Sequence, residues 1–363
     1  MTPRATSNWR HRTDAARALL HGLVPLSATV FARVAIAAPP AVGAGSQDMT
    51  RSVGPQAAQI VDLWNLTLGI CTLVFAAVLV TFLWALWRAP RGSAETPADV
   101  SGLQQVEPGP RRGVVAGIAL SAALLLVLLV ASVTTDRALA QLGLHDALHI
   151  ELTGRQWWWS VRYDDADPSK IFETANELHI PVGRPVIVTL KSDDVIHSLW
   201  VPNLGGKKDL IPGRSATLTL RADRPGVYRG QCAEFCGHQH AWMALLVVAE
   251  PPAQYDTWAA HQREPAATPS DATAQRGQQI FLGSSCVMCH TITGTDAGAR
   301  SAPDLTHLRS RQTLAAGALP NDPQHLAAWI SNPHAHKPGV NMPAHAFAAE
   351  DLQALVAYLG SLE

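Results

Sequence analysis

The segment from Arg229 to Met243 gathers soft metal donors at close spacing. It reads R-G-Q-C-A-E-F-C-G-H-Q-H-A-W-M and places two thiols, two imidazoles and a thioether within twelve residues. Thiolate and thioether sulfur favour copper, and imidazole suits it too. A mononuclear blue-copper site needs a single cysteine, whereas two thiolates can bridge two copper ions and pass one electron with little ligand rearrangement. The segment therefore predicts a two-copper electron-transfer site.

A second motif, D-D-V-I-H-S-L-W-V-P, supplies His197 well upstream of the cysteines. One ligand from an early loop and a cluster from a late loop is the way a cupredoxin closes its copper site. A zinc site of two cysteines and two histidines is the alternative, but it leaves Met243 unexplained. Two disulfides are a further alternative, and the histidines beside both close cysteine pairs favour metal and haem chemistry instead.

The sequence C-V-M-C-H at 286–290 is the signature of covalent haem c attachment. Cys286 and Cys289 would form the thioethers, and His290 would be the proximal iron ligand. A thioredoxin-like redox pair is the alternative, but no βαβ pattern surrounds it. Met342 is the only methionine beyond the motif and is the expected sixth ligand, which would raise the haem potential. The rival ligands are interpreted as surface residues: His307, His334, His336 and His345.

His197 followed by C-x-E-x-C-x-x-x-H-x-x-M resembles the CuA site of cytochrome c oxidase subunit II, and the resemblance covers about residues 55–250. It implies that Cys232 and Cys236 bridge two coppers, and that His197 and His240 each bind one ion. By the same resemblance, Met243 binds one copper and the Glu234 carbonyl the other. The Glu234 side chain would reach a magnesium ion at the boundary with subunit I. His238 matches no ligand and is expected beside the site or on the surface.

Two further segments extend the resemblance. G-R-Q-W-W-W-S-V-R-Y at 154–163 matches the family segment in which the first tryptophan, here Trp157, lies over the copper site and receives the incoming electron. The alternative is that this tryptophan run only packs the domain against its partner. The region after the haem motif, including A-P-D-L at 302–305, resembles class I cytochromes c.

Two apolar runs, Leu66–Trp87 and Gly113–Val133, carry no charged residue and are each about long enough to span a membrane. We expect spans at about 62–88 and 112–134. Arginines flank the loop between them, which predicts a cytoplasmic loop and an outer-face C-terminal region. The second span lacks the glutamate–tryptophan pair found in many family members at the mouth of a proton channel. Glu107 lies nearby, and the proton route is left unassigned.

The expected organisation has five parts. Residues 1–49 are a weak signal peptide or disordered extension, 50–135 the membrane hairpin, 136–250 a cupredoxin-like antiparallel β-barrel or sandwich, 251–271 a proline-rich linker, and 272–363 an all-α cytochrome c domain. The net charge of −1 gives no reason to expect nucleic acid binding.

The resemblance implies subunit II of a caa-type terminal oxidase in the bacterial plasma membrane. Electrons from cytochrome c or a bc complex would pass through haem c and CuA to haem a of subunit I, where oxygen is reduced and protons are pumped. Subunit III and membrane lipid are the other expected partners. The alternatives are the equivalent subunit of a CuA-containing nitric oxide reductase and a copper chaperone or assembly factor.

Overall fold

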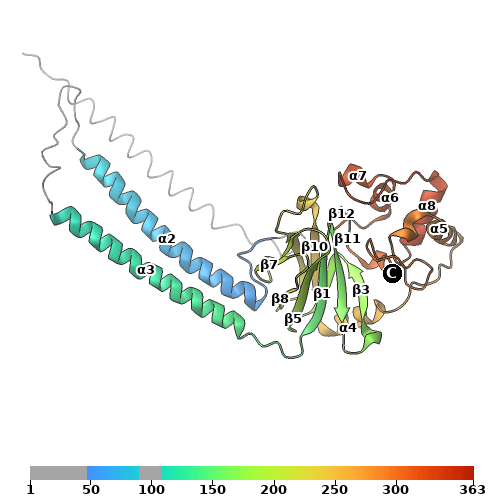
Figure 1. Ribbon diagram of the computed structural model, residues 1–363, viewed down its shortest axis with the longest axis horizontal. Helices are drawn as coiled ribbons and strands as arrows, with labels where there is room; N and C mark the ends of the chain where they lie inside the picture. Colours follow the sequence, from blue (N-terminus) through green and yellow to red (C-terminus); the bar gives the residue numbers. More distant parts are fainter. Residues whose placement is uncertain (1–46, 90–107) are drawn as a thin grey trace, which may run out of the picture. The chain divides into compact units, whose positions relative to one another are not determined.

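The computed structural model describes residues 47–89 and 108–363 (Figure 1). Residues 1–46 of the expected signal peptide or disordered extension lie outside the described part of the chain, as does Glu107. Two long helices come first, α2 (Pro55–Arg88) and α3 (Pro108–Ala140). Both are long and apolar enough to cross a membrane by length and composition, and their apolar windows are not buried in the protein. Each helix is longer than the expected span, because its ends continue past the apolar run.

Two five-stranded sheets form the middle of the chain and pack as a β-sandwich. The first sheet has the order β3 (Phe172–Ala175), β2 (Trp158–Asp164), β1 (Leu148–Arg155), β5 (Val186–Ser192) and β8 (Ala216–Leu220). The second has the order β4 (Glu177–Pro181), β10 (Ala244–Glu250), β9 (Gly226–Cys232), β6 (His197–Trp200) and β7 (Lys207–Leu210).

Buried and partly exposed side chains alternate along the strands of the sandwich, with the period of two that a half-buried strand requires. In β2, Trp159, Val161 and Tyr163 are buried and their neighbours are partly exposed. Most strand pairs are antiparallel, as expected, but each sheet also contains one parallel pair, β1 with β5 and β4 with β10. The expected cupredoxin-like class is confirmed, with this mixed strand direction as its added detail.

The segment expected to be a linker, 251–271, is not extended throughout. It contains helix α4 (Pro252–His261), which begins with a proline at a position where the missing N–H costs nothing. Trp258 of this helix stacks on His179 with ring centroids 4.0 Å apart and also contacts Tyr163 edge-on. Trp258 therefore packs this segment against the sandwich. Its proline content alone did not predict this contact.

The C-terminal region is helical, as expected. Its helices are α5 (Ala272–Leu282), α6 (Pro323–Ser331), α7 (Pro333–His336) and α8 (Ala349–Leu359), with a short hairpin of β11 (Thr313–Leu314) and β12 (Leu319–Pro320). Asp271 begins α5 by accepting from the backbone N–H groups of Thr273 and Ala274. Phe281 of α5 and Tyr358 of α8 lie in one buried apolar cluster, which forms the core of this domain.

Candidate metal and haem centres

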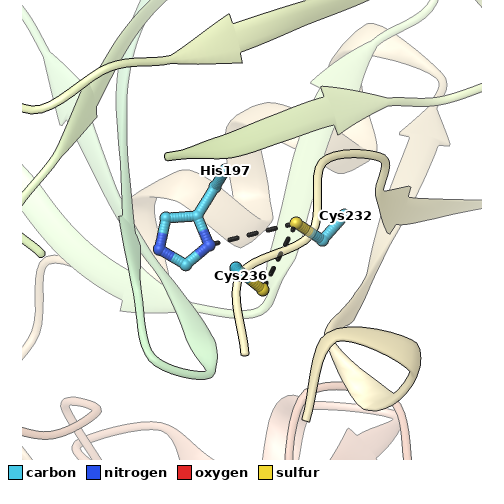
Figure 2. A group of neighbouring side chains, drawn as sticks. All are labelled: His197, Cys232 and Cys236. Carbon is cyan, nitrogen blue, oxygen red and sulfur yellow. Dashed lines mark hydrogen bonds between the residues drawn. The ribbon is translucent and has the colours of Figure 1, made fainter. Parts of the chain in front are cut away.

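Two cysteine thiols form the middle of the first centre. Cys232 is the last residue of β9, and Cys236 lies four residues later in the loop that follows. Both side chains are buried and unbridged, and their Sγ atoms are 3.7 Å apart. Figure 2 shows the two sulfurs facing each other with His197 beside them.

Strand pairing brings His197 to the thiols across 35 residues of sequence. His197 begins β6, which runs antiparallel to β9 with Leu199 opposite Cys232. Its Nδ1 atom lies 3.9 Å from Cys232 Sγ. On the far side of the ring, Nε2 lies 2.7 Å from a carboxylate oxygen of Asp194. A ligand histidine is commonly oriented by such a partner on its second nitrogen, so Asp194 aims Nδ1 at the sulfur.

The remaining predicted donors converge on the same thiols. The Glu234 carbonyl oxygen is 3.2 Å from Cys232 Sγ. His240 Nδ1 and Met243 Sδ are 3.7 Å and 3.9 Å from Cys236 Sγ. All six residues singled out in the sequence therefore lie together, and the donor set of sulfur, imidazole and one carbonyl fits copper.

Protonation of the thiol pair is uneven. A hydrogen bond from Cys236 lowers the pKa of Cys232, against the opposing effect of burial, and His197 adds to the shift. The same bond and the charge on Cys232 raise the pKa of Cys236. Burial alone would lower the pKa of His197, but its bonds with Cys232 and Asp194 outweigh burial and raise it. A negative sulfur is thus present at neutral pH, and it favours a cation between the donors.

Trp157 and Gln156 contact this centre directly. The Trp157 Nε1–H and the Gln156 Nε2–H both donate to the Cys236 carbonyl, at 2.9 Å and 2.7 Å. Gly237 makes this approach possible: its backbone has φ of +111°, and a Cβ there would lie 3.0 Å from the indole. Trp157 also meets His238 edge-on, with ring centroids 6.3 Å apart. His238 is exposed and points no donor at the thiols, as expected.

A cavity of about 650 Å³ forms the second centre, a size typical of a cofactor site. Its lining includes the four predicted haem residues: Cys286, Cys289, His290 and Met342. His290 Nδ1 donates to the Pro303 carbonyl at 2.7 Å, which leaves Nε2 for iron. Burial lowers the pKa of His290, so the neutral ligand form predominates near pH 7.

Arg311 supplies an independent test of whether haem fits this cavity. Its side chain is buried and lines the cavity, and its Nε–H has no hydrogen-bond partner in the described part of the chain. An unpaired buried cation is costly, and a haem propionate is an anion of the right chemistry to pair with it. The residues present therefore fit haem.

The four rival histidines differ in whether they are buried and whether they line the haem cavity. His307 was interpreted as a surface residue, which is wrong: it is buried, and its ring nitrogens contact the Glu363 and Glu264 carbonyls, so it is a satisfied core residue. His345 lines the cavity, as Met342 does, so it remains a rival for the axial iron ligand. His334 and His336 lie in α7 and do not line the cavity.

Three residues of these centres could not be identified from the sequence: Asp194, Gln156 and Arg311. Asp194 lies in the quoted motif D-D-V-I-H, three residues before the ligand, and this spacing was its only local signal. Gln156 precedes Trp157 in the tryptophan-rich segment but carries no signal of its own. Arg311 gives no signal, because its burial depends on the folded domain.

Comparisons with known proteins identify two families along the chain. Residues 166–250 match the family described as cytochrome c oxidase subunit II, periplasmic domain, and residues 274–363 match cytochrome c. Cytochrome c oxidase subunit 2 of Alkalihalophilus pseudofirmus is 35% identical over 319 residues, 85% of this chain and 89% of that protein. The protein of that name from Bacillus sp. PS3 is 32% identical over 66% of this chain and 71% of its own.

A solved structure of the periplasmic domain of subunit II of cytochrome oxidase (CoxB) of Bradyrhizobium japonicum is 31% identical, with a TM-score of 0.31. It covers 33% of this chain and 97% of its own. The match to the Alkalihalophilus protein extends over most of both chains. The chain therefore belongs to the cytochrome c oxidase subunit 2 family and carries a fused cytochrome c domain.

Proposed function

We propose that this subunit of a haem–copper oxidase accepts electrons from cytochrome c or a bc complex and relays them through haem c and a binuclear CuA centre. The acceptor is haem a of subunit I, where oxygen reduction is coupled to proton pumping. Subunit III completes the complex. One observation carries the proposal: Trp157 contacts both a paired set of soft donors and a haem-sized cavity.

The pairing of donors supports two copper ions rather than one. Each thiol has an imidazole next to it: His197 lies by Cys232 and His240 by Cys236. Each thiol also has one weak donor, the Glu234 carbonyl or the Met243 thioether. A single tetrahedral zinc would use only the cysteines and histidines. Two bridged coppers use all six donors and supply a one-electron couple.

Trp157 is the proposed relay. It lines the haem cavity, and its indole donates to the Cys236 carbonyl, so one residue contacts both centres. Changing Trp157 to Phe leaves that carbonyl bonded to Gln156, so the copper absorption should persist while electron transfer from haem to copper slows. A rate equal to that of the unchanged chain would leave Trp157 as a packing residue only.

The chain entering and leaving the helical hairpin supports a two-pass topology. Just before α2, the Val53 N–H donates to the Asn203 carbonyl of the sandwich, and α3 is followed directly by β1. Both outer ends of the hairpin therefore lie on the sandwich side of the membrane. Arg88, Arg111 and Arg112 lie at the opposite ends, which favours a cytoplasmic loop and a periplasmic sandwich at the inner membrane.

The segment 233–243 between β9 and β10, here called the copper loop, offers a surface for subunit I. The Glu234 side chain is exposed while its own carbonyl faces Cys232, so the carboxylate is free to bind a magnesium ion shared with the partner. Phe235, the next residue, and Trp242, which directly precedes Met243, are 75% and 53% exposed. Large exposed apolar side chains grouped at a site are typical of a protein interface.

The proposal is tested by purifying the chain with its partners and measuring metals and haems. We expect two coppers and one haem c per chain, with haem a in the complex. Zinc in place of copper, or no copper, would overturn the copper assignment. A partner that reduces nitric oxide instead of oxygen would overturn the oxidase assignment and leave the centres unchanged.

A further inference from the structure

Lys337 has an unusual environment. Its side chain is only 1% exposed, and no ion pair to it is found within residues 47–89 and 108–363. Its Nζ instead donates to three backbone carbonyls, those of Trp157 at 3.2 Å, Trp242 at 2.9 Å and Ala315 at 2.9 Å. An ammonium group has three donors, so all of them are used.

These carbonyls belong to three different segments. Trp157 follows β1 and contacts the copper loop, Trp242 directly precedes the ligand Met243, and Ala315 lies in the β11–β12 turn of the haem domain. Lys337 itself belongs to the haem domain, five residues before the expected axial ligand Met342. One side chain therefore bonds the haem domain (residues 272–363) to the copper domain (the β-sandwich, residues 136–250), next to both cofactor sites.

Neighbouring bonds extend the same contact. Asn341 Nδ2 donates to the Gln156 carbonyl at 3.0 Å. Gln239 donates to the Pro338 carbonyl, and the Ala244 N–H donates to the Ala316 carbonyl at 3.0 Å. The segment 337–342 is thus bonded to the backbone of Gln156 and Trp157, whose side chains both bond to the Cys236 carbonyl.

We propose that Lys337 is a positioning residue that locks the haem domain onto the copper domain, so that the Met342 segment and Trp157 are held in contact. The inference rests on the proposed function, since the contact serves electron transfer from haem to copper within one chain. Electron tunnelling weakens steeply with separation, so the transfer rate follows the fraction of chains in the docked arrangement.

The test compares the full chain, loaded with haem and copper, with the variants Lys337→Met and Lys170→Met. The second is a matched control, because Lys170 is exposed on the copper domain. The first measurement is hydrogen–deuterium exchange of peptides covering 154–158 and 312–317, made with and without cofactors. The second is the rate of light-triggered electron transfer from haem to copper, with both cofactor absorption bands recorded.

We expect Lys337→Met to exchange faster in both peptides and to transfer electrons about tenfold more slowly or worse, with both bands retained, because the docked fraction falls. Lys170→Met should match the unchanged chain. An unchanged exchange pattern and rate in Lys337→Met would overturn the proposal. Loss of either band would also overturn it, since Lys337 would then hold a cofactor site rather than the docking.

Asn341→Ala provides a second route if Lys337→Met does not fold. It removes one exposed bond of the same contact and should slow transfer in the same direction by a smaller factor; no slowing would contradict the docking role. If the unchanged chain binds copper and haem but passes no electron between them, the relay fails. Hydrogen exchange would still decide whether Lys337 docks the domains.

Discussion

His197 packs directly against Gly154, and this contact makes the copper site sensitive to a single methyl group. In Gly154→Ala, the new Cβ would lie 2.7 Å from His197 Cδ2 and 2.9 Å from Cγ, where ordinary contact begins at 3.4 Å. The imidazole must therefore move by roughly 0.7 Å, which is 3.4 Å minus 2.7 Å. The tightly packed core leaves no empty space for the added methyl group. His197 is held on its other side by Asp194, so the ring has little freedom to move.

Overpacking of this kind typically costs about 1–3 kcal/mol. If the imidazole stays in place, this cost lowers the free energy of unfolding of the copper-free chain. If the imidazole moves aside, the cost appears when copper draws it back, and copper affinity falls roughly 5- to 150-fold. The two cases are separated by measuring unfolding of the copper-free chain and a copper titration against a competing chelator.

Gly143→Ala is the matched control, since a Cβ at Gly143 meets no atom within 4 Å and its φ is not in the left-handed region. Its copper affinity should equal that of the unchanged chain, and its stability should be equal or slightly higher. The reasoning would be refuted if Gly154→Ala bound copper with unchanged affinity and unfolded at an unchanged free energy.

Three further predictions follow from the haem domain and the sandwich. Met342→Ala should abolish the weak Met–iron charge-transfer band and His345→Ala should retain it; absence of this band from the unchanged chain would favour His345 as the axial ligand. Arg311→Gln should lower the haem reduction potential in a redox titration, because a buried positive charge beside the cavity favours the less positive reduced haem; an equal or higher potential would contradict this. Burial alone would lower the pKa of His179, but bonds and charges from Glu177 and Glu250 outweigh it and raise the pKa. That stabilisation is full below the unfolded pKa of about 6.5 and is lost as pH rises through the raised value. The stability difference between the unchanged chain and His179→Gln in urea should therefore shrink with rising pH, and a growing difference would reverse the sign of the argument.

The ligand chemistry was predictable because it is local. The segment from Cys232 to Met243 is short, and 286–290 is a continuous motif, so residue type and spacing indicated the chemistry, and the family resemblance implied the individual copper ligands. The two membrane helices were predictable for the same reason, since an uninterrupted apolar run needs no tertiary partner to be recognised. The β class of 136–250 was predictable because its strands, such as Val186–Ser192 and Ala216–Leu220, contain short aliphatic runs between proline-containing turns.

Other features were hidden because they depend on residues far apart. Helix α4 is held by Trp258 stacking on His179, a contact that proline content could not reveal. His307 is buried, and its ring contacts the carbonyls of Glu264 before the haem domain and Glu363 at its far end. Asp194 could be found near its histidine in sequence, but its bond to Nε2 needed the folded loop.

The sequence by itself indicated which residues are the candidate copper and haem ligands, because side-chain chemistry, short spacing and the family resemblance can be recognised without the fold. Only the tertiary structure decided how the two centres are joined. The bond from Lys337 to the Trp157 carbonyl spans 180 residues, and that from Asn341 to Gln156 spans 185. Contacts at such separation depend on how two folded domains pack, and no local pattern of residue types encodes that arrangement.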